Sequence, residues 1–295
     1  PDGAADRAAW IRHGAEYLTP TSGPDARADA ELLWCRASGE DRSTAALRHG
    51  ERAPQAALAR FLDWLPRFGA GEPLAYLEGR AGFYGLNLAV DARVLVPRPD
   101  SESVVELGLD QLEVGAQGWI ADLGTGSGCL LLAMLHERPH LRGLGVDRSA
   151  EALTVASQNA SALGFATRCA FVQSDWMEGV RGPFALILSN PPYVAPGEEL
   201  GPGVAEYEPH AALFTPRDQP LAAYARILSR AREALAPGGK LIFEVGAGRA
   251  QELSALARRQ GWTEVGRQRD LGGIERALAF APRAAQRPES ASASR

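Results

Sequence analysis

The sequence predicts an α/β fold: a doubly wound, mostly parallel sheet of seven strands with an antiparallel last strand, a small N-terminal helical domain and a β-hairpin linker. Two observations support this prediction. From Trp119 onward, short apolar runs alternate with helical stretches, and a βαβα order builds a parallel sheet with helices on both faces. The last two apolar runs are joined by a short loop, and strands that close in sequence must pair antiparallel.

The strands and helices of this α/β region follow from the spacing of its apolar residues. We expect strands at Trp119–Leu123, Leu141–Val146, Ala170–Val172, Phe184–Leu188, Leu241–Val245, Thr263–Gln268 and Glu275–Phe280. We expect helices at Cys129–His136, Ala150–Leu163, Leu221–Leu235 and Ala250–Gln260. A further helix begins near Ser101, directly after prolines that restrict the backbone.

The chain in front of this region is helical and then changes character. Apolar residues recur at helical spacing from Asp6 to Phe68, and Thr19–Pro24 separates the first two helices. Further on, Phe83–Val90 and Arg93–Val96 are the two arms of a predicted β-hairpin. We therefore divide the chain into a helical domain, a linker with a hairpin, an α/β domain and a disordered tail rich in Ala, Ser and Arg, at residues 1–70, 71–100, 101–282 and 283–295.

The composition is that of a globular protein, with 45% hydrophobic and 23% charged residues. Its net charge of -5 does not suit a phosphate-binding surface, so we expect no direct nucleic-acid binding. Cys35, Cys129 and Cys169 form no CxxC pair, which favours a reducing compartment over disulfides or a zinc cluster. No apolar run approaches the roughly 20 residues that span a bilayer, and the first residues lack a secretory pattern. We expect a cytoplasmic protein without membrane contact.

A glycine-rich loop follows the first strand of the α/β region. It consists of Gly124, Thr125, Gly126, Ser127 and Gly128, which lie between Asp122-Leu123 and a helix. Glycines permit a tight turn and the close approach of a ligand to the backbone. Alone, such a loop is shared by dinucleotide enzymes and methyltransferases, and it also fits a plain strand-to-helix turn.

Acidic residues after the second and third strands fit an adenosine-containing cofactor. Asp147 ends the second strand about 20 residues past the glycine loop, where a carboxylate can accept both ribose hydroxyls, although it could instead cap the next helix. Asp175 could bind the adenine amino group, and Trp176 could stack on the ring or simply fill the core. At this point NAD and S-adenosylmethionine both remain open.

The sequence Asn190-Pro191-Pro192-Tyr193 directly follows the strand Phe184–Leu188. Ligands of open α/β sheets bind outside the carboxyl ends of the strands. The prolines stiffen the loop and leave carbonyl oxygens free, and Asn190 adds a side-chain carbonyl. These groups could accept both N–H bonds of a planar amide or amine while Tyr193 covers its face. The loop therefore predicts methyl transfer to a planar nitrogen by positioning and electrostatics.

The run His136-Glu137-Arg138-Pro139-His140 spells the zinc-protease pattern H-E-x-x-H. Zinc binding by this pattern requires an unbroken helix that places both histidines on one face. Because Pro139 ends the helix, we interpret these residues as a solvated helix end and expect no metal.

Taken in chain order, the motifs resemble class I S-adenosylmethionine-dependent methyltransferases with a Rossmann-like fold, and more narrowly the HemK-type release factor glutamine N5-methyltransferases. The resemblance covers nearly the whole chain. Its most selective part is the combination of Pro97-Arg98-Pro99-Asp100 with the Asn190–Tyr193 loop. The other matching segments are Gly71–Arg80, the glycine loop, Ser174–Trp176, Tyr207–Pro209 and Arg269–Arg276.

The resemblance implies a function and a set of site residues. S-adenosylmethionine is the implied cofactor, S-adenosylhomocysteine its product, and the glutamine of the Gly-Gly-Gln loop in class I peptide chain release factors the implied substrate. The helical domain would help to grip that partner. The cofactor would be held by residues 124–128, Asp147, Asp175, Trp176 and Asn190, and the substrate by Asn190, Pro191, Pro192, Tyr193, Val96 and Arg98, of which Asn190 to Tyr193 are catalytic.

One departure and several alternatives remain. Where the family has an Asp-Gly turn after Tyr207–Pro209, this chain has Arg217–Pro220. A sister enzyme that methylates a ribosomal protein glutamine shares the catalytic loop, but we would expect Pro-Arg-Ser there. The loop also suits a DNA or RNA adenine amino-methyltransferase. The acidic net charge and the absence of an obvious target-recognition insert argue against this alternative. A cofactor-sensing module without turnover is the last alternative.

Overall fold

A computed structural model describes residues 5–217 and 219–283, which pack as two units. The helical unit contains the chain up to Ala81 together with Ala89–Val96 and Glu199–His210. The sheet unit contains Gly82–Leu88, Pro97–Glu198 and the chain from Ala211 onward. The predicted domain limits stay a prediction, and the predicted tail beyond residue 283 lies outside the described residues.

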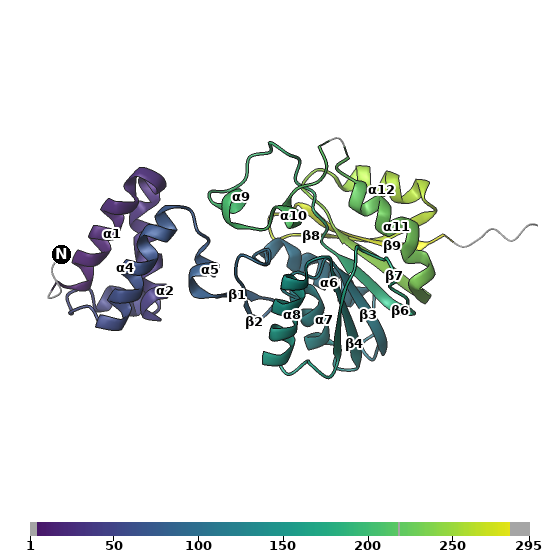
Figure 1. Ribbon diagram of the computed structural model, residues 1–295, viewed down its shortest axis with the longest axis horizontal. Coiled ribbons are helices and arrows are strands. Elements are labelled where there is room, and N and C mark those ends of the chain that lie inside the picture. Colours follow the sequence, from purple (N-terminus) through teal and green to yellow (C-terminus); the bar gives the residue numbers. More distant parts are fainter. Residues whose placement is uncertain (1–4, 218, 284–295) are drawn as a thin grey trace, which may run out of the picture. The chain divides into compact units, whose positions relative to one another are not determined.

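The helical unit is built on helices that bury their apolar sides against one another (Figure 1). Trp34 and Phe61 meet edge to face in its core, with ring centroids 5.5 Å apart. The break between the first two helices lies toward the end of the predicted segment Thr19–Pro24, because α1 continues through Pro20 and ends at Ser22, where Gly23 caps it with a φ of 54°. The helices are α1 (Arg7–Ser22), the 3-10 turn η1 (Gly23–Asp25), α2 (Ala26–Ser38), α3 (Arg42–Leu47), α4 (Gln55–Gly69) and α5 (Leu74–Glu78).

The segment Glu199–His210, which contains helix α9 (Val204–Tyr207), packs within the helical unit although it follows the Asn-Pro-Pro-Tyr loop in sequence. Its Glu208 side chain is buried and accepts a hydrogen bond from the Val96 amide at 3.0 Å. Gly203 lies so close to Gly71 that a Cβ atom there would be 1.6 Å from the Gly71 carbonyl oxygen. Only glycine at position 203 permits this contact.

The β-hairpin is present but is shifted from its predicted position. Strands β1 (Arg80–Phe83) and β2 (Leu86–Ala89) form a two-stranded sheet, with Tyr84 and Gly85 at φ of 49° and 75° in the turn. Positive φ at both turn residues matches the twist of paired strands. The prediction of a strand at Arg93–Val96 is wrong, because the chain turns there and the Val94 amide donates to the Asp91 carbonyl at 3.0 Å.

The seven-stranded sheet of the sheet unit confirms the predicted fold class. The strand order is β5-β4-β3-β6-β7-β9-β8, and β9 pairs antiparallel with both β7 and β8, whereas the other pairs are parallel. In Figure 1 helices cover both faces of this sheet. The strands are β3 (Gly118–Leu123), β4 (Leu141–Asp147), β5 (Cys169–Gln173), β6 (Phe184–Ser189), β7 (Leu235–Glu244), β8 (Trp262–Arg269) and β9 (Glu275–Pro282). The helices are η2 (Pro99–Ser101), α6 (Glu102–Asp110), α7 (Cys129–Glu137), α8 (Ala150–Ala162), α10 (His210–Leu213), α11 (Ala222–Ala234) and α12 (Ala250–Arg259).

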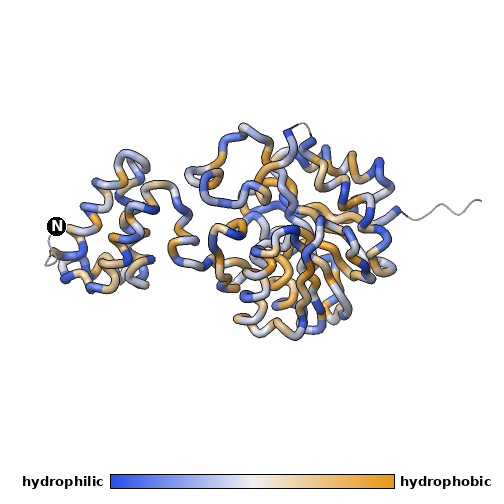
Figure 2. The backbone as a smooth tube through the Cα atoms, viewed as in Figure 1, coloured by the Kyte–Doolittle hydropathy of each residue, from blue (hydrophilic) through white to orange (hydrophobic). Residues whose placement is uncertain are grey.

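Apolar side chains from the central strands form two buried clusters on opposite faces of the sheet. Ile120 belongs to one cluster and its neighbour Ala121 to the other, as alternation along a strand requires. Figure 2 shows the hydrophobic colour concentrated in this central region. Leu123 pairs with Val146 on one side and with Ser189 on the other, so three parallel strands end at the same edge. Ligands of such sheets bind at that edge.

Candidate functional site

The glycine-rich loop turns sharply at the carboxyl end of β3. Gly124, Gly126 and Gly128 have φ of 75°, 54° and 85°, values that favour glycine. The amides of Gly124 and Thr125 both donate to the Val146 carbonyl, at 2.8 and 2.9 Å. The loop is therefore tied to β4, and its first glycine leaves a stretch of exposed backbone in front of the sheet edge.

Asp147 organises the same edge from the end of β4. Its two carboxylate oxygens accept hydrogen bonds from the amides of Gly126 at 3.0 Å and Ser149 at 2.9 Å. The cap of α8 is supplied instead by Ser149, whose hydroxyl accepts from the Ala152 amide at 3.1 Å. Each carboxylate oxygen of Asp147 retains acceptor capacity, since one oxygen can accept about two hydrogen bonds. The structure thus places Asp147 against the loop.

Asp122 is a buried acid beside this loop and was not among the predicted site residues. Its side chain is 1% exposed, and one oxygen accepts from the Thr125 hydroxyl at 2.7 Å. Burial raises the pKa of Asp122 to about 7, and the nearby Asp147 charge adds to the rise. A charged residue inside an apolar strand is the sequence signal that could have marked it. Its other oxygen and the Ser127 hydroxyl are buried without a hydrogen-bond partner among the described residues.

Asp175 and Trp176, the two residues predicted to contact adenine, lie after β5. Trp176 has a φ of 56°, unusual for a large side chain, and its ring faces Gly124, where an added Cβ would be 3.3 Å from it. The same ring packs partly against the core, so both of its predicted roles are compatible with its position. Asp175 is half-buried and forms an ion pair with Arg226 at 2.7 Å.

The Asn-Pro-Pro-Tyr loop leaves the sheet edge directly after β6. The Ser189 hydroxyl donates to the Leu123 carbonyl at 2.7 Å, which ties this strand end to β3. Pro191 is buried and Pro192 half-buried. The Asn190 side-chain amide donates to the Ser101 hydroxyl at 3.3 Å. The loop is thus fixed to the beginning of α6 as well as to the sheet.

Tyr193 contacts the end of β7 and the residues that follow it. Its hydroxyl donates to an oxygen of Glu244 at 3.3 Å, and its ring packs so closely on Gly246 that an added Cβ there would be 2.9 Å away. Burial raises the pKa of Tyr193, and the Glu244 charge raises it further. Tyr193 therefore remains a neutral hydrogen-bond donor with a flat ring at the site.

Glu244 is the second buried acid that the sequence did not mark as a site residue. It is 1% exposed at the end of β7. Burial raises the pKa of Glu244 to about 7, while the nearby hydroxyls of Ser101 and Tyr193 and the charge of Arg276 act in the opposite direction. Arg276 is itself paired with Asp100 at 2.8 Å.

The two other predicted substrate residues are not both in the sheet unit. Arg98 belongs to it and is half-buried, and its carbonyl accepts from the Ser101 amide at 3.1 Å. Val96 belongs to the helical unit, where Glu208 holds its amide. The structure therefore brings together Asn190 to Tyr193 and the cofactor-loop residues, whereas Val96 is placed only within its own unit.

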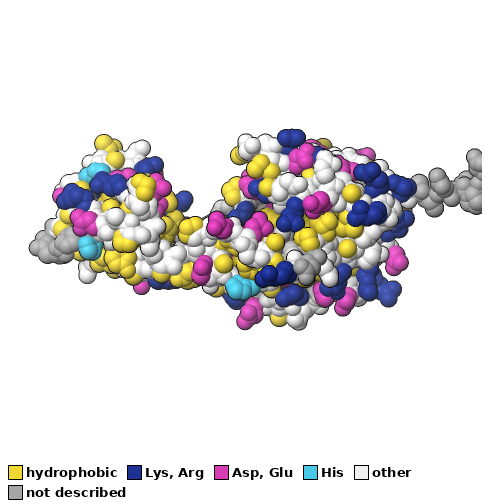
Figure 3. All heavy atoms as spheres, turned by 90° about the horizontal axis from the view of Figure 1, so that it is seen from above, with side chains coloured by type: hydrophobic (Ala, Val, Ile, Leu, Met, Phe, Trp, Pro, Cys, Tyr) yellow, Lys and Arg dark blue, Asp and Glu magenta, His cyan; other side chains and the backbone are white. Residues whose placement is uncertain are grey.

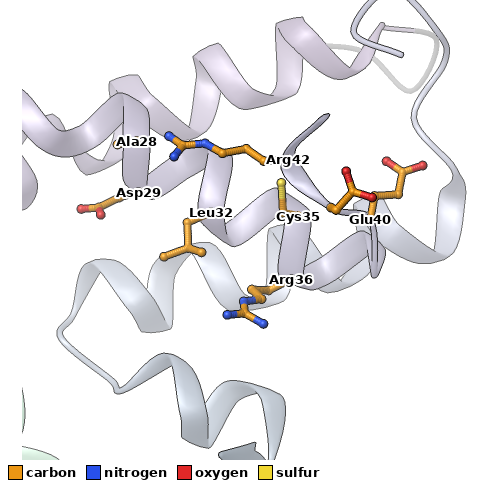
Figure 4. A pocket seen from close by; sticks show the side chains of 8 residues that line it. Ala28, Asp29, Leu32, Cys35, Arg36, Glu40 and Arg42 are labelled. Carbon is orange, nitrogen blue, oxygen red and sulfur yellow. The ribbon is translucent and has the colours of Figure 1, made fainter. Parts of the chain in front are cut away.

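The features described next lie away from this sheet edge. A pocket of about 400 Å³ in the helical unit is lined by Leu32, Cys35 and several charged side chains, among them Arg36 and Arg42 (Figure 4), and it contains no predicted site residue. Figure 3 shows acidic and basic side chains intermixed on one face of the sheet unit. Helix α7 ends at Glu137, before Pro139, as predicted. Among the described helices, none has the length and apolarity to cross a membrane.

Two family models and a group of known relatives match this chain. A family model described as PrmC N-terminal domain matches residues 9–79, and one described as Methyltransferase small domain matches residues 102–205. A release factor glutamine methyltransferase from Bradyrhizobium diazoefficiens is 40% identical, over 86% of this chain and 87% of the relative. Relatives of the same description from Nitratidesulfovibrio vulgaris and Salmonella typhimurium are 35% and 36% identical, each over 90% of this chain and over 92% and 95% of their own lengths.

A solved structure supports the fold alone. The crystal structure of a methyltransferase from Pyrococcus furiosus aligns with a TM-score of 0.50 at 17% sequence identity, covering 74% of this chain and 97% of that chain.

Proposed function

The chain belongs to the release factor glutamine methyltransferase family, and on that premise we propose that it transfers a methyl group from S-adenosylmethionine to the side-chain amide nitrogen of the glutamine in the Gly-Gly-Gln loop of class I translation release factors. The observation that best supports this proposal is the position of Asn190. Its side-chain nitrogen donates to Ser101 at the sheet edge where three strands end. We place the enzyme in the cytoplasm and expect it to recognise this protein loop without nucleic acid.

The residues of the glycine loop fit the cofactor. The Trp176 ring lies close against the bare backbone of Gly124, so an adenine that stacks on this ring would lie beside the glycine loop. Asp147 holds the loop and has lone pairs left for the two ribose hydroxyls. Buried atoms of Asp122 and Ser127 that have no hydrogen-bond partner among the described residues offer further polar groups beside the loop. When bound, S-adenosylmethionine supplies an electrophilic methyl carbon.

Asn190 and the prolines would bind the substrate amide through its two N–H bonds. The nitrogen of Asn190 faces Ser101, so its oxygen is the end available to accept from the substrate. Pro191 lacks an N–H and cannot compete as a donor, and backbone carbonyls of the loop can accept the second bond. Two acceptors fix the plane of the substrate amide, and Tyr193 supports one face. The lone pair of the substrate nitrogen, which is perpendicular to that plane, would then be held in a fixed direction for the transfer.

The chemistry that remains is a displacement. The substrate nitrogen would form a bond to the methyl carbon as the bond from that carbon to sulfur breaks, which would leave S-adenosylhomocysteine, and the nitrogen would then release one proton to solvent to restore a neutral amide. An amide nitrogen is a poor nucleophile, so the chain contributes chiefly by orientation and by acceptors that increase electron density on the nitrogen. No strong base is required before attack.

A direct test compares two asparagine variants. Asn190→Ala should lower methyl transfer by about 100- to 1000-fold while changing the dissociation constant of S-adenosylhomocysteine by no more than about twofold. Asn87→Ala is the matched control, because Asn87 is exposed on β2 and is not a predicted site residue. Transfer would be followed with methyl-labelled cofactor and an unmethylated release factor. Near-normal turnover by Asn190→Ala would contradict the proposed mechanism.

A further inference from the structure

The polar side chains of the Asn-Pro-Pro-Tyr loop, Asn190 and Tyr193, contact two different segments of the sheet unit. The Asn190 side-chain nitrogen donates to the hydroxyl of Ser101, the last residue of η2, at 3.3 Å. The Tyr193 hydroxyl donates to Glu244, the last residue of β7, at 3.3 Å. Ser101 and Glu244 are 3% and 1% exposed. Both contacts can form together only if η2 and the end of β7 are held in a fixed relative position.

Arg276, the second residue of β9, joins these two segments. Its carbonyl oxygen accepts from the Val245 amide at 2.8 Å, which fixes its backbone beside the end of β7. Its guanidinium forms an ion pair with Asp100, the residue before Ser101, at 2.8 Å. A second ion pair, with Asp270 at 2.9 Å, holds the same side chain from the loop between β8 and β9. The Arg276 side chain is only 14% exposed, and its planar set of donors is therefore fixed in direction.

We propose that Arg276 is a positioning residue, which through its ion pair with Asp100 holds η2 in a fixed position beside the end of β7. The supports of Asn190 and Tyr193 are then in place at the same time, and the loop presents both side chains to the substrate in one geometry. This inference rests on the proposed function for its effect on methyl transfer. Its structural part concerns the placement of the Asn190 side chain and can be tested without any substrate.

The two ion pairs of Arg276 differ in what they contribute to stability. The Asp100 side chain is 44% exposed, and ion pairs with such exposure contribute little to folding. The Asp270 side chain is 6% exposed, and it also accepts from the Ile274 amide at 2.9 Å. Replacing Arg276 would leave this buried acid without its charged partner, which destabilises a protein. Asp100→Ala is therefore the cleaner substitution, because it removes the contact with η2 and keeps the pair with Asp270.

The placement of Asn190 can be followed by nuclear magnetic resonance. The chain contains only three asparagines, so isotopic labelling of asparagine alone yields three side-chain amide pairs. The Asn190 signals should move in Asp100→Ala and in Arg276→Gln, because η2 is released from β9. Arg267→Gln is the matched control, because Arg267 lies on the neighbouring strand β8 and its two ion pairs, at 2.8 Å each, are made within the β8–β9 hairpin. Asn190 signals that stay unchanged in Asp100→Ala and Arg276→Gln would overturn the inference.

Kinetics test the effect on methyl transfer. Asp100→Ala and Arg276→Gln should each lower kcat by about tenfold, with the dissociation constant of S-adenosylhomocysteine within about twofold of the wild type. The double variant should be no slower than the slower single variant, because either change breaks the same contact. If the two losses instead multiply to about 100-fold, the residues act independently and the inference is wrong. Asp100→Glu, which keeps the carboxylate, should recover most of the lost kcat.

The melting temperature separates a positioning role from a purely structural one. Asp100→Ala should melt close to the wild type although its kcat is reduced, and a melting temperature that falls together with kcat would assign the ion pair to folding instead. A wild-type enzyme without methyl transfer would refute the proposed function, and the resonance comparison would then decide the positioning role. An active wild type with fully active Asp100→Ala and Arg276→Gln variants would refute only the positioning role.

Discussion

Replacing Asp147 by alanine is the most informative single perturbation of the cofactor site. The change removes the acceptors for two backbone amides, those of Gly126 at 3.0 Å and Ser149 at 2.9 Å. It also removes the proposed acceptor for both ribose hydroxyls. We therefore expect two separate effects, a loss of folding stability and a larger loss of cofactor affinity.

The magnitudes follow from the hydrogen bonds. A bond to a charged group contributes about 1.5–3 kcal/mol, and the half-buried position of Asp147 favours the lower value. Two bonds to the ribose then correspond to about 3 kcal/mol, or roughly a 100-fold rise in the dissociation constant. The two backbone amides can be partly solvated in the variant, so the unfolding free energy should fall by about 1–2 kcal/mol. Asp147→Asn retains one neutral acceptor and should weaken binding by about tenfold.

Isothermal titration calorimetry with S-adenosylhomocysteine measures the affinities, and chemical unfolding measures the stabilities. Asp63→Ala is a suitable control, because Asp63 is exposed on α4 and its contact with Arg67 spans 3.5 Å. An Asp147→Ala variant that binds S-adenosylhomocysteine within about twofold of the wild type, while remaining folded, would refute the assignment of Asp147 to the ribose.

Other predictions concern the loop, the helical unit and pH. Trp176→Ala should raise the dissociation constant of S-adenosylhomocysteine by about tenfold in calorimetry through loss of a stacking surface, and an unchanged constant would make Trp176 a core residue only. Gly203→Ala should destabilise the helical unit by about 2 kcal/mol or more in chemical unfolding, since its φ is 74° and its Cβ would collide with the Gly71 carbonyl. Burial raises the pKa of Asp122 from 3.8 to about 7 and that of Glu244 from 4.5 to about 7. At a pH between the ordinary and the raised pKa values the folded protein binds more protons than the unfolded chain, so the free energy of unfolding should fall as the pH rises through this range. A free energy of unfolding that does not change with pH there would contradict this prediction.

The sheet could be predicted because its strands obey a local rule. Central parallel strands are mostly apolar, and β3, β4 and β6 each lie within about one residue of their predicted limits. The antiparallel end could be predicted from the short loop between β8 and β9, since no crossover fits there. The predicted arm at Arg93–Val96 failed because alternating apolar residues also occur in buried turns.

The site could be predicted only in part, for a physical reason. Residues that contact a ligand lie in loops with unusual glycine and proline content, and this content is visible in the sequence. Ser101 and Glu244 are common residue types at distant positions, and only the fold brings them behind Asn190 and Tyr193. Likewise, the contact of Gly203 with Gly71 depends on a return of the chain to the helical unit that no local pattern indicates.

The proposed substrate is tested most directly by locating the methyl group. The protein would be incubated with methyl-labelled S-adenosylmethionine and, in parallel, an unmethylated class I release factor, a ribosomal fraction and DNA, and the modified products would be analysed by mass spectrometry. We predict a single added methyl on the glutamine of the Gly-Gly-Gln loop of the release factor, absent when Asn190→Ala replaces the wild type. Label on a ribosomal protein or on DNA, with none on that glutamine, would contradict the proposed function.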